Sequence, residues 1–330
     1  MTTTDGQGKG EPVELWAKAA KQAADRVASH LAPSTLWRAR GIEASMKGRT
    51  GQLHLKLENQ QPTGSFKVRG AFHKLLNLSA EARANGVIAA STGNHGAAVA
   101  FAAQTLGISA HVVVPEPTAP DRVDAITRFG ADVTRHGEEC GASEAHAREM
   151  GRSMGRTFVS PYNDPDVMAG QGSMAMELRA QNPNLRRIYI AVGGGGLMGG
   201  VGAALRYFLP DVEIIGCSPD ASFAMEAAVA AGEVVEVPHL PTLSLATAGE
   251  LERDTVTLAP CEAVVDRWLR ASEAEIAGAM RTAYLRERIL IEGAAGVALA
   301  AWMKDEGEGD ACVVICGGNV DVGDLVRVFE

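Results

Sequence analysis

One lysine stands where covalent chemistry is feasible. Lys67 lies in the segment QPTGSFKVRGA at 61–71, where Pro62 and Gly64 favour a turn and Ser65 is a good N-cap for a following helix. Lys67 would then occupy the first helical turn, where the helix dipole disfavours a positive charge. That field, together with partial burial, would lower the pKa of the amine and favour a neutral nucleophile able to form a Schiff base. A solvated surface lysine is the alternative, and this segment taken alone favours it.

Two loops have the composition of anion sites. The segment STGNHG at 91–96 follows the apolar run 87–90 and opens a helix, so free backbone N–H groups gather there. It suits a phosphate or a carboxylate as well as it suits a simple N-cap turn. His95 by itself indicates a structural hydrogen-bonding group more than a base.

The second loop, GGGGLMGG at 193–200, also connects an apolar strand to a helix. Successive glycine N–H groups can form a nest for phosphate. Gly194, Gly196 and Gly199 satisfy G-x-G-x-x-G, and Asp220 lies near the end of the next strand, as a dinucleotide site would require. A single phosphate monoester, such as that of pyridoxal phosphate, fits equally well.

A third strand, at 313–316, runs into the glycine turn of CGGN at 316–319. Ligands bind at the carboxyl ends of parallel strands, so Cys316 could turn its weakly polar sulfur toward one. A buried small hydrophobic residue is the alternative, and it is the commoner role of a lone cysteine.

The elements that must position these residues alternate between apolar strands and helical segments, which predicts an α/β fold with parallel sheets covered on both faces. Strands are expected at 54–58, 87–91, 110–115, 132–135, 187–192, 212–217 and 311–316. Helices are expected at 12–31, 66–78, 94–106, 119–129, 141–154, 165–181, 198–208, 222–231, 273–288 and 293–304. Residues 1–11 are expected to be disordered.

Composition narrows the class further. The chain has 330 residues, 46% hydrophobic and 22% charged, which is long enough for two cores, and its net charge of -9 argues against nucleic acid or an anionic membrane as a partner. Five cysteines without a CxxC pair favour a reducing, cytoplasmic location, and the polar N-terminus is not a signal peptide. The uncharged run 188–205 has nearly the length of a membrane span, but its seven glycines indicate strand, loop and helix start instead.

The order of these segments resembles that of the threonine/serine dehydratase and serine racemase group of fold-type II pyridoxal-phosphate enzymes. The resemblance spans about residues 30–330 and rests on SFKVRGA, ASTGNHG, AGQG at 169–172, VGGGGLMGG, EGAAGVAL at 292–299 and CGGN. It implies a tryptophan synthase β-like fold with two parallel-sheet domains. A large cofactor-binding domain would comprise 12–85 and 164–330, and a small mobile domain would comprise 86–163 and close over the substrate.

The resemblance also implies roles for single residues. Lys67 matches the Schiff-base lysine that shuttles the α-proton, and Thr92 matches the position where racemases carry a serine on the opposite face. The remaining matches are Phe66 against the cofactor ring, Asn94 on its 3′-oxygen, Gly193, Gly194, Gly195, Gly196 and Leu197 around its phosphate, Cys316 at its pyridine nitrogen, Glu292 near the ring, and Ser91, Thr92, Asn94 and His95 on the substrate carboxylate.

The expected activity is that of a dehydratase, which converts L-threonine, L-serine or a 3-hydroxyaspartate-like substrate to a 2-keto acid and ammonia. An amino-acid racemase and a catalytically poor binding homologue are the alternatives, and a hydroxyectoine-utilisation dehydratase is a specialised version. Metal-dependent relatives place Glu and Asp where this chain has Ser218 and Ala224, so no metal is expected. Leu245-Ala246 replaces an Asp-Gly of relatives, which leaves the substrate open. The chain ends soon after CGGN, so a catabolic role without feedback control is expected, as a homodimer or homotetramer.

Overall fold

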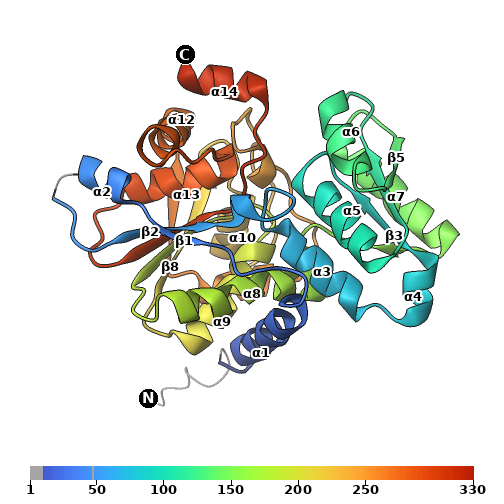
Figure 1. The fold of residues 1–330 in the computed structure, drawn as a ribbon, viewed down its shortest axis with the longest axis horizontal. Coiled ribbons are helices and arrows are strands. Elements are labelled where there is room, and N and C mark those ends of the chain that lie inside the picture. Colours follow the sequence, from blue (N-terminus) through green and yellow to red (C-terminus); the bar gives the residue numbers. More distant parts are fainter. Residues whose placement is uncertain (1–9, 47) are drawn as a thin grey trace.

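The structure is a computed structural model that describes residues 10–46 and 48–330. Residues 1–11 were expected to be disordered, and residues 1–9 lie outside the described residues. The first helix already begins at Gly10, so the expectation is wrong for residues 10 and 11. Figure 1 shows two sheets flanked by helices, which confirms the predicted α/β class.

In the described part of the chain, ten strands form the two sheets. The six-stranded sheet has the order β1-β2-β10-β7-β8-β9, and all its pairs are parallel except β1 with β2. Its strands are β1 (Leu36–Arg38), β2 (Leu53–Leu57), β7 (Arg187–Ala191), β8 (Glu213–Pro219), β9 (Arg267–Ala271) and β10 (Ala311–Ile315). The four-stranded sheet, β5-β4-β3-β6, is parallel and comprises β3 (Val87–Ala90), β4 (Ala110–Val114), β5 (Asp132–Arg135) and β6 (Thr157–Phe158).

The helices cover both faces of these sheets. They are α1 (Gly10–Val27), α2 (Arg40–Ser45), α3 (Lys67–Asn77), α4 (Ala80–Asn85), α5 (Asn94–Leu106), α6 (Pro120–Thr127), α7 (Cys140–Met154), α8 (Pro165–Gln181), α9 (Gly196–Phe208), α10 (Ala224–Ala231), α11 (Leu258–Val264), α12 (Glu273–Thr282), α13 (Gly293–Lys304) and α14 (Val322–Phe329). Two short 3₁₀ segments, η1 (Glu58–Gln60) and η2 (Leu245–Thr247), and a π-helical turn, η3 (Ala283–Glu287), complete the set.

Every expected strand and helix is present, with ends shifted by a few residues. The helix expected at 273–288 is wrong in its last part, because the α-helix ends at Thr282 and continues as the π-helical turn η3, after which Arg288 has a left-handed backbone (φ 60°). The short strands β1, β6 and β9 and the helices α2, α4, α11 and α14 were not predicted. All of these elements have eight residues or fewer, which is shorter than the window over which a hydrophobic period is read.

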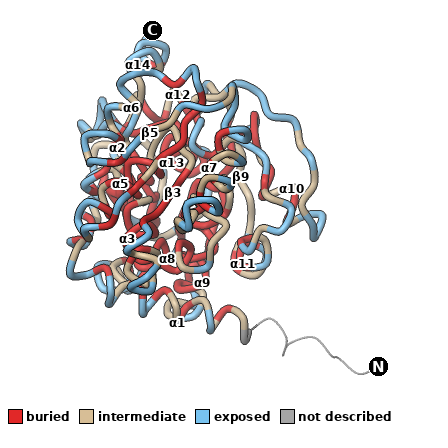
Figure 2. Tube along the Cα trace, turned by 90° about the vertical axis from the view of Figure 1, so that its right-hand side faces the viewer, coloured by how far each residue is buried: buried red, intermediate tan, exposed pale blue. Residues whose placement is uncertain are grey.

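The alternation of side chains along the central strands explains why helices cover both faces of the smaller sheet. Ala89 of β3 and Val112 of β4 pack in one core with α5, whereas Ile88 and Val113 pack on the opposite face against Ala147 of α7. The core on the α5 side also includes Val27 and Leu31 and apolar residues of α3. Figure 2 shows the buried residues gathered along the strands and around α8 and α9.

A buried charge network ties the start of α3 to the larger sheet. The Arg69 guanidinium, 1% exposed, pairs with Glu58 (Nε–Oε2 2.7 Å) and Glu177 of α8 (Nη1–Oε1 2.6 Å), and the buried Lys56 of β2 also contacts Glu177 (2.6 Å). Burial would raise the pKa of Glu177, but Arg69 and Lys56 outweigh it and hold that pKa below its usual value. Lys67 lies two residues from Arg69, so the network also anchors the turn that carries the reactive lysine.

We predict that Arg69→Ala lowers the free energy of unfolding by about 3–5 kcal/mol, because it leaves the buried Glu58 without a cation and leaves Glu177 with Lys56 alone. Urea denaturation followed by circular dichroism measures this loss. Arg152→Ala is the matched control, since its pair with Glu149 is exposed and should cost about 0.5 kcal/mol or less. Similar small losses in both variants would show that the network contributes no stability.

Candidate active site

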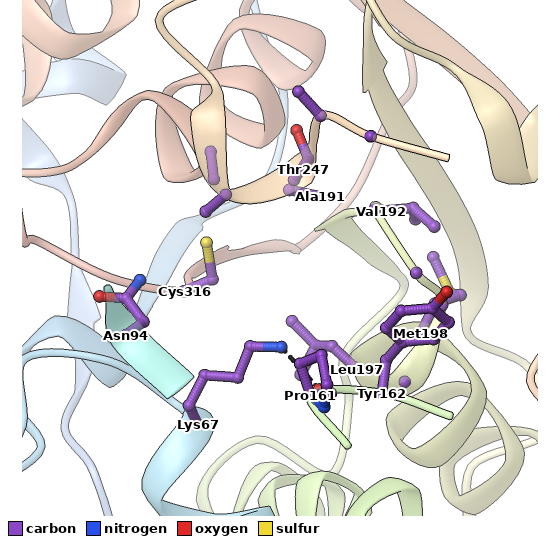
Figure 3. A pocket seen from close by; sticks show the side chains of 18 of the residues that line it. Lys67, Asn94, Pro161, Tyr162, Ala191, Val192, Leu197, Met198, Thr247 and Cys316 are labelled. Atoms are coloured by element: carbon purple, nitrogen blue, oxygen red, sulfur yellow. Dashed lines mark hydrogen bonds between the residues drawn. The ribbon is translucent and has the colours of Figure 1, made fainter. Parts of the chain in front are cut away.

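Two adjoining cavities lie at the carboxyl ends of β7 and β10. The inner cavity, of about 200 Å³, is lined by the glycine segment 193–196 together with Lys67, Tyr162 and Cys316 (Figure 3). The outer cavity, of about 380 Å³, is lined by the loop 91–95 and shares Lys67 and the residues Asn94 and Glu292 with the inner one. Residues spread from 63 to 324 in the sequence therefore meet at one place, as the parallel topology requires.

Lys67 begins α3, but Ser65 is not its N-cap. The N-cap is Phe66, whose backbone N–H donates to the Cys316 carbonyl at 3.0 Å, while Ser65 pairs with Gly317 in an isolated bridge. The helix start is therefore held by the end of β10 and not by a side-chain cap, which a local pattern cannot reveal.

The Lys67 amine points into the cavity and donates to the Pro161 carbonyl at 2.8 Å (Figure 3). Burial lowers its pKa to about 8, an effect that the nearby Cys316 and Glu292 only partly oppose. No carboxylate lies within ion-pair distance of the Lys67 amine among the described residues. An amine of this kind is a good nucleophile near neutral pH.

Cys316 and Phe66 complete the surroundings of the lysine. The Cys316 side chain extends into the cavity from the end of β10, between Asn94 and Thr247 in Figure 3. Burial, together with the nearby Glu292, raises the pKa of its thiol well above the usual value, so it stays neutral. The Phe66 ring lies 5.1 Å from the Lys67 amine and lines the same cavity.

Glu292 joins the two sides of the cleft. Its buried carboxylate accepts from Asn94 Nδ2 (2.9 and 3.0 Å) and from the Asn319 backbone N–H (3.2 Å), and Asn319 Nδ2 in turn donates to Asn94 Oδ1 (2.7 Å). Burial raises the pKa of Glu292 to about 7, against the lowering effect of these hydrogen bonds. The side-chain amide of Asn94 is thus held at the boundary of both cavities.

The loop expected to hold a carboxylate lines the outer cavity. Ser91, Thr92 and Asn94 are half-buried around the start of α5, where free N–H groups point outward. His95 is buried and donates from Nε2 to the Val159 carbonyl at 2.8 Å. Burial and the neighbouring Lys67 lower the pKa of His95 to about 3, so it is neutral and adds no positive charge to the loop.

The glycine segment fits closely between its neighbours. A Cβ on Gly194 would lie 2.3 Å from the Tyr162 ring, and one on Gly193 would lie 2.9 Å from the backbone of Thr247. Gly195 has a left-handed backbone (φ 82°), which follows from the turn between β7 and α9. The segment ends at Gly196, the first residue of α9, where the positive end of the helix favours an anion. Leu197 follows in the cavity wall.

Tyr162 and Thr247 are the main site residues that the sequence did not reveal. Tyr162 packs on the glycine segment, and its hydroxyl accepts from the Glu252 backbone N–H at 2.9 Å. Tyr162 lies in an irregular segment and Thr247 ends the short 3₁₀ segment η2, and neither belongs to a motif of its own. The only available signal was position, because Tyr162 lies shortly before the AGQG segment at 169–172.

The residues present fit pyridoxal phosphate. A buried amine with a lowered pKa lies in one cavity with a glycine cradle at a helix start, and a neutral thiol ends the adjacent strand. A dinucleotide would also need Asp220 nearby, but Asp220 is exposed and does not line either cavity.

Comparison with known proteins agrees with this geometry. Residues 27–317 match the family described as "Pyridoxal-phosphate dependent enzyme", and the chain belongs to that family. It is 36% identical to an L-threonine ammonia-lyase of Thermotoga maritima over 282 residues, which cover 85% of this chain and 70% of that protein.

Two solved structures extend the comparison. The processed form of threonine deaminase isoform 2 from Solanum lycopersicum superposes with a TM-score of 0.89 at 28% identity, over 100% of this chain and 90% of that one. A maize serine racemase superposes with a TM-score of 0.87 at 26% identity, over 95% of this chain and 96% of that one. The predicted cofactor and the predicted fold-type II architecture are therefore confirmed.

Two further features concern metals and membranes. Ser218 and Ala224, the two positions considered from the sequence for a metal site, are both buried, and no cluster of three or more metal-ligating side chains occurs in 10–46 and 48–330. In the same part of the chain, every helix is too short or too polar to span a bilayer.

We predict that cofactor incorporation into the apoenzyme becomes half-maximal near pH 8, because only the neutral Lys67 amine reacts and its pKa is about 8. The visible band of lysine-bound cofactor, followed by stopped-flow absorbance between pH 6 and 10, measures the rate. Lys67→Ala should show no such band, whereas Lys21→Ala, on the exposed face of α1, should behave as the parent protein. A rate that still rises tenfold per pH unit above pH 9 would contradict the lowered pKa.

Proposed function

We propose that this protein removes water and ammonia from a small 3-hydroxy-L-amino acid, with L-threonine and L-serine as the leading substrates and a 2-keto acid as product. The observation that carries the proposal is that the buried Lys67 amine, with its lowered pKa, shares the cavity of the glycine cradle with the neutral Cys316 thiol. The 36% identity to an L-threonine ammonia-lyase supports the same activity.

Lys67 serves the reaction at the junction of the two cavities. Pyridoxal phosphate, when bound, withdraws electrons from the substrate's α-carbon and makes its proton acidic. Lys67 Nζ, which lines both the inner and the outer cavity, is placed to hold the cofactor and then to accept that α-proton. Its lowered pKa gives the amine a much larger neutral, proton-accepting fraction near neutral pH than an exposed lysine has.

Cys316 would face the pyridine nitrogen of bound pyridoxal phosphate, as the resemblance implies. A neutral thiol there would stabilise negative charge at the α-carbon less than an aspartate would, which would suit prompt loss of the β-hydroxyl. Thr92, the candidate base on the opposite face, carries a methyl group that crowds the outer cavity, so we give the racemase activity second place.

The loop 91–95 binds the substrate carboxylate in this proposal. Its donors are the N–H groups at the start of α5 and the hydroxyls of Ser91 and Thr92, since the neutral His95 contributes none of the charge. His95 instead anchors the loop to Val159.

Closure of residues 86–163 over the cleft excludes water from the reaction. Two ion pairs join this part of the chain to the rest in the present structure: Arg122 of α6 with Asp321, and Arg148 of α7 with Glu252 at 2.8 Å. The first pair lies at the mouth of the outer cavity, beside Asn319. Both pairs are placed to stabilise the closed arrangement.

The decisive experiment measures keto acid and ammonia released from L-serine, L-threonine, both L-3-hydroxyaspartate diastereomers and their D-isomers by the cofactor-loaded enzyme. Turnover of one or two L-substrates supports the proposal and identifies the substrate. Appearance of a D-isomer without ammonia would support the racemase instead, and no product with an intact cofactor band would point to a binding homologue.

In the same assay, Cys316→Ser should retain most activity, within about threefold, because it keeps a neutral group at the same place. Cys316→Asp should lose about 100-fold or more, since a buried carboxylate there changes the protonation of the neighbouring nitrogen. The cofactor absorption spectrum of each variant checks that loading is unchanged. Equal activity in the two variants would overturn the argument from the thiol.

We further propose that the protein is a cytoplasmic homodimer. Apolar side chains at one end of the molecule face solvent without a partner: Val322, Val326 and Phe329 of α14, with Tyr284 and Leu285 of η3. The rings of Tyr284 and Phe329 are in contact, with centroids 5.4 Å apart, so the two elements form one surface. Figure 1 shows α14 at the outer edge, far from α1. A second copy seated there would bury this surface.

We expect Val326→Asp to convert a dimer into a monomer, because a carboxylate would be buried in the contact. Analytical ultracentrifugation of the holoenzyme measures the mass. Leu15→Asp is the control, since Leu15 is 68% exposed on α1 at the opposite end and should leave the assembly unchanged. A dimer that survives Val326→Asp would place the contact elsewhere.

A further inference from the structure

A hydroxyl behind the glycine segment has no place in the function described so far. Thr257, the N-cap residue of α11, is completely buried and donates from Oγ1 to the Gly194 carbonyl at 2.6 Å. One turn further along, Cys261 Sγ contacts the Gly195 carbonyl at 3.6 Å. Neither residue lines the cavities, so both lie on the side of the segment that faces away from the site.

We propose that Thr257 is a positioning residue that aims the N–H groups of the glycine segment at the phosphate of the cofactor. The proposal rests on the cofactor site and is independent of which substrate reacts.

The planarity of the peptide bond connects the hydroxyl to the cavity. In a trans peptide the C=O and the following N–H point in opposite directions. Because Thr257 holds the Gly194 carbonyl toward α11, the N–H of Gly195 is turned away from α11, to the side on which the cavity lies. The Gly195 carbonyl is oriented by α9 itself, because it accepts from the Gly199 backbone N–H at 2.8 Å, and this fixes the N–H of Gly196; the Cys261 thiol adds only a longer contact at 3.6 Å. Two successive donors are thereby set before the anion arrives.

A segment of four glycines needs such an external constraint. Glycine restricts its own φ and ψ less than any other residue, so the peptide planes of 193–196 are not oriented by their side chains. The Tyr162 ring covers Gly194, and a Cβ there would lie 2.3 Å from that ring, but an aromatic ring does not select the direction of a carbonyl. Only a hydrogen bond does so, and Thr257 supplies one.

The direction of this hydrogen bond is itself determined. A threonine hydroxyl has one proton, and Thr257 gives it to Gly194. The contact between Thr255 Oγ1 and Thr257 Oγ1 at 2.8 Å must then be donated by Thr255. Thr255 Oγ1 also accepts from the Thr257 backbone N–H at 3.4 Å, which keeps the pair together.

The test compares pyridoxal phosphate with pyridoxal, which lacks the phosphate. Thr257→Val keeps the shape and removes the donor, and it should weaken binding of pyridoxal phosphate about tenfold, as expected for a buried hydrogen bond to an anion site. Binding of pyridoxal should change less than twofold. Thr257→Ser retains the hydroxyl and should restore the affinity for pyridoxal phosphate. Equilibrium constants come from absorbance titration of each apoenzyme.

Matched controls separate positioning from packing. Thr105→Val removes a similar hydroxyl-to-carbonyl bond (to Phe101, 2.9 Å) on the exposed side of α5 and should leave both affinities unchanged. Thr255→Val removes the hydroxyl that donates to Thr257, and it should weaken binding of pyridoxal phosphate by about twofold to threefold without changing binding of pyridoxal. This variant replaces Thr257→Val in the test if Thr257→Val does not fold.

An equal loss for pyridoxal and pyridoxal phosphate would overturn the proposal, since it would mean that Thr257 only supports packing. Unchanged affinity for both compounds would overturn it as well. The result is separable from the activity. A protein that discriminates the two compounds as expected but releases no ammonia would contradict the proposed reaction and leave the role of Thr257 intact.

Discussion

The structure depends on keeping one amine buried without a neutralising carboxylate. Lys67 can be held this way because its neighbours are a carbonyl, a thiol and a phenyl ring, and because its own pKa falls to about 8. The fall in pKa reflects the cost of burying the charged ammonium form. The charges that α3 does need are placed two residues away, where Arg69 meets its two carboxylates on the other side of the helix start. The reactive residue and the residue that stabilises the fold thus lie in the same helical turn but have separate surroundings.

The second constraint is close approach of backbones around the cofactor site. Side chains are excluded from the glycine segment on both faces, by Tyr162 and Thr247 on one hand and by Thr257 and Cys261 on the other. The same holds at Gly317, where a Cβ would lie 2.5 Å from the Glu292 carboxylate. Sequence reasoning attributed these glycines to phosphate alone. The structure adds that protein neighbours also require them.

The two sheets meet through polar groups, which suits a cleft that opens and closes. Asn94, at the start of α5, reaches Glu292 and Asn319, which follow from the larger sheet. The ion pair between Arg122 and Asp321 lies at the mouth of the same cleft. Hydrogen bonds of this kind can exchange with a ligand at little cost, whereas an apolar contact of the same area could not.

The sequence by itself determined the class of fold, because strand–helix alternation is a local pattern with a local physical cause. The glycine-rich turns alone left a dinucleotide and a phosphate monoester open. Pyridoxal phosphate and the roles of Lys67 and Cys316 followed from the order of the motifs and the family that this order resembles. Only the tertiary structure decided that Phe66 and not Ser65 ends the turn before α3, that His95 is neutral, and that Tyr162 and Thr257 hold the glycine segment. These features depend on residues far apart in the chain, and burial, carbonyl direction and ring contact leave no periodic trace in a single sequence.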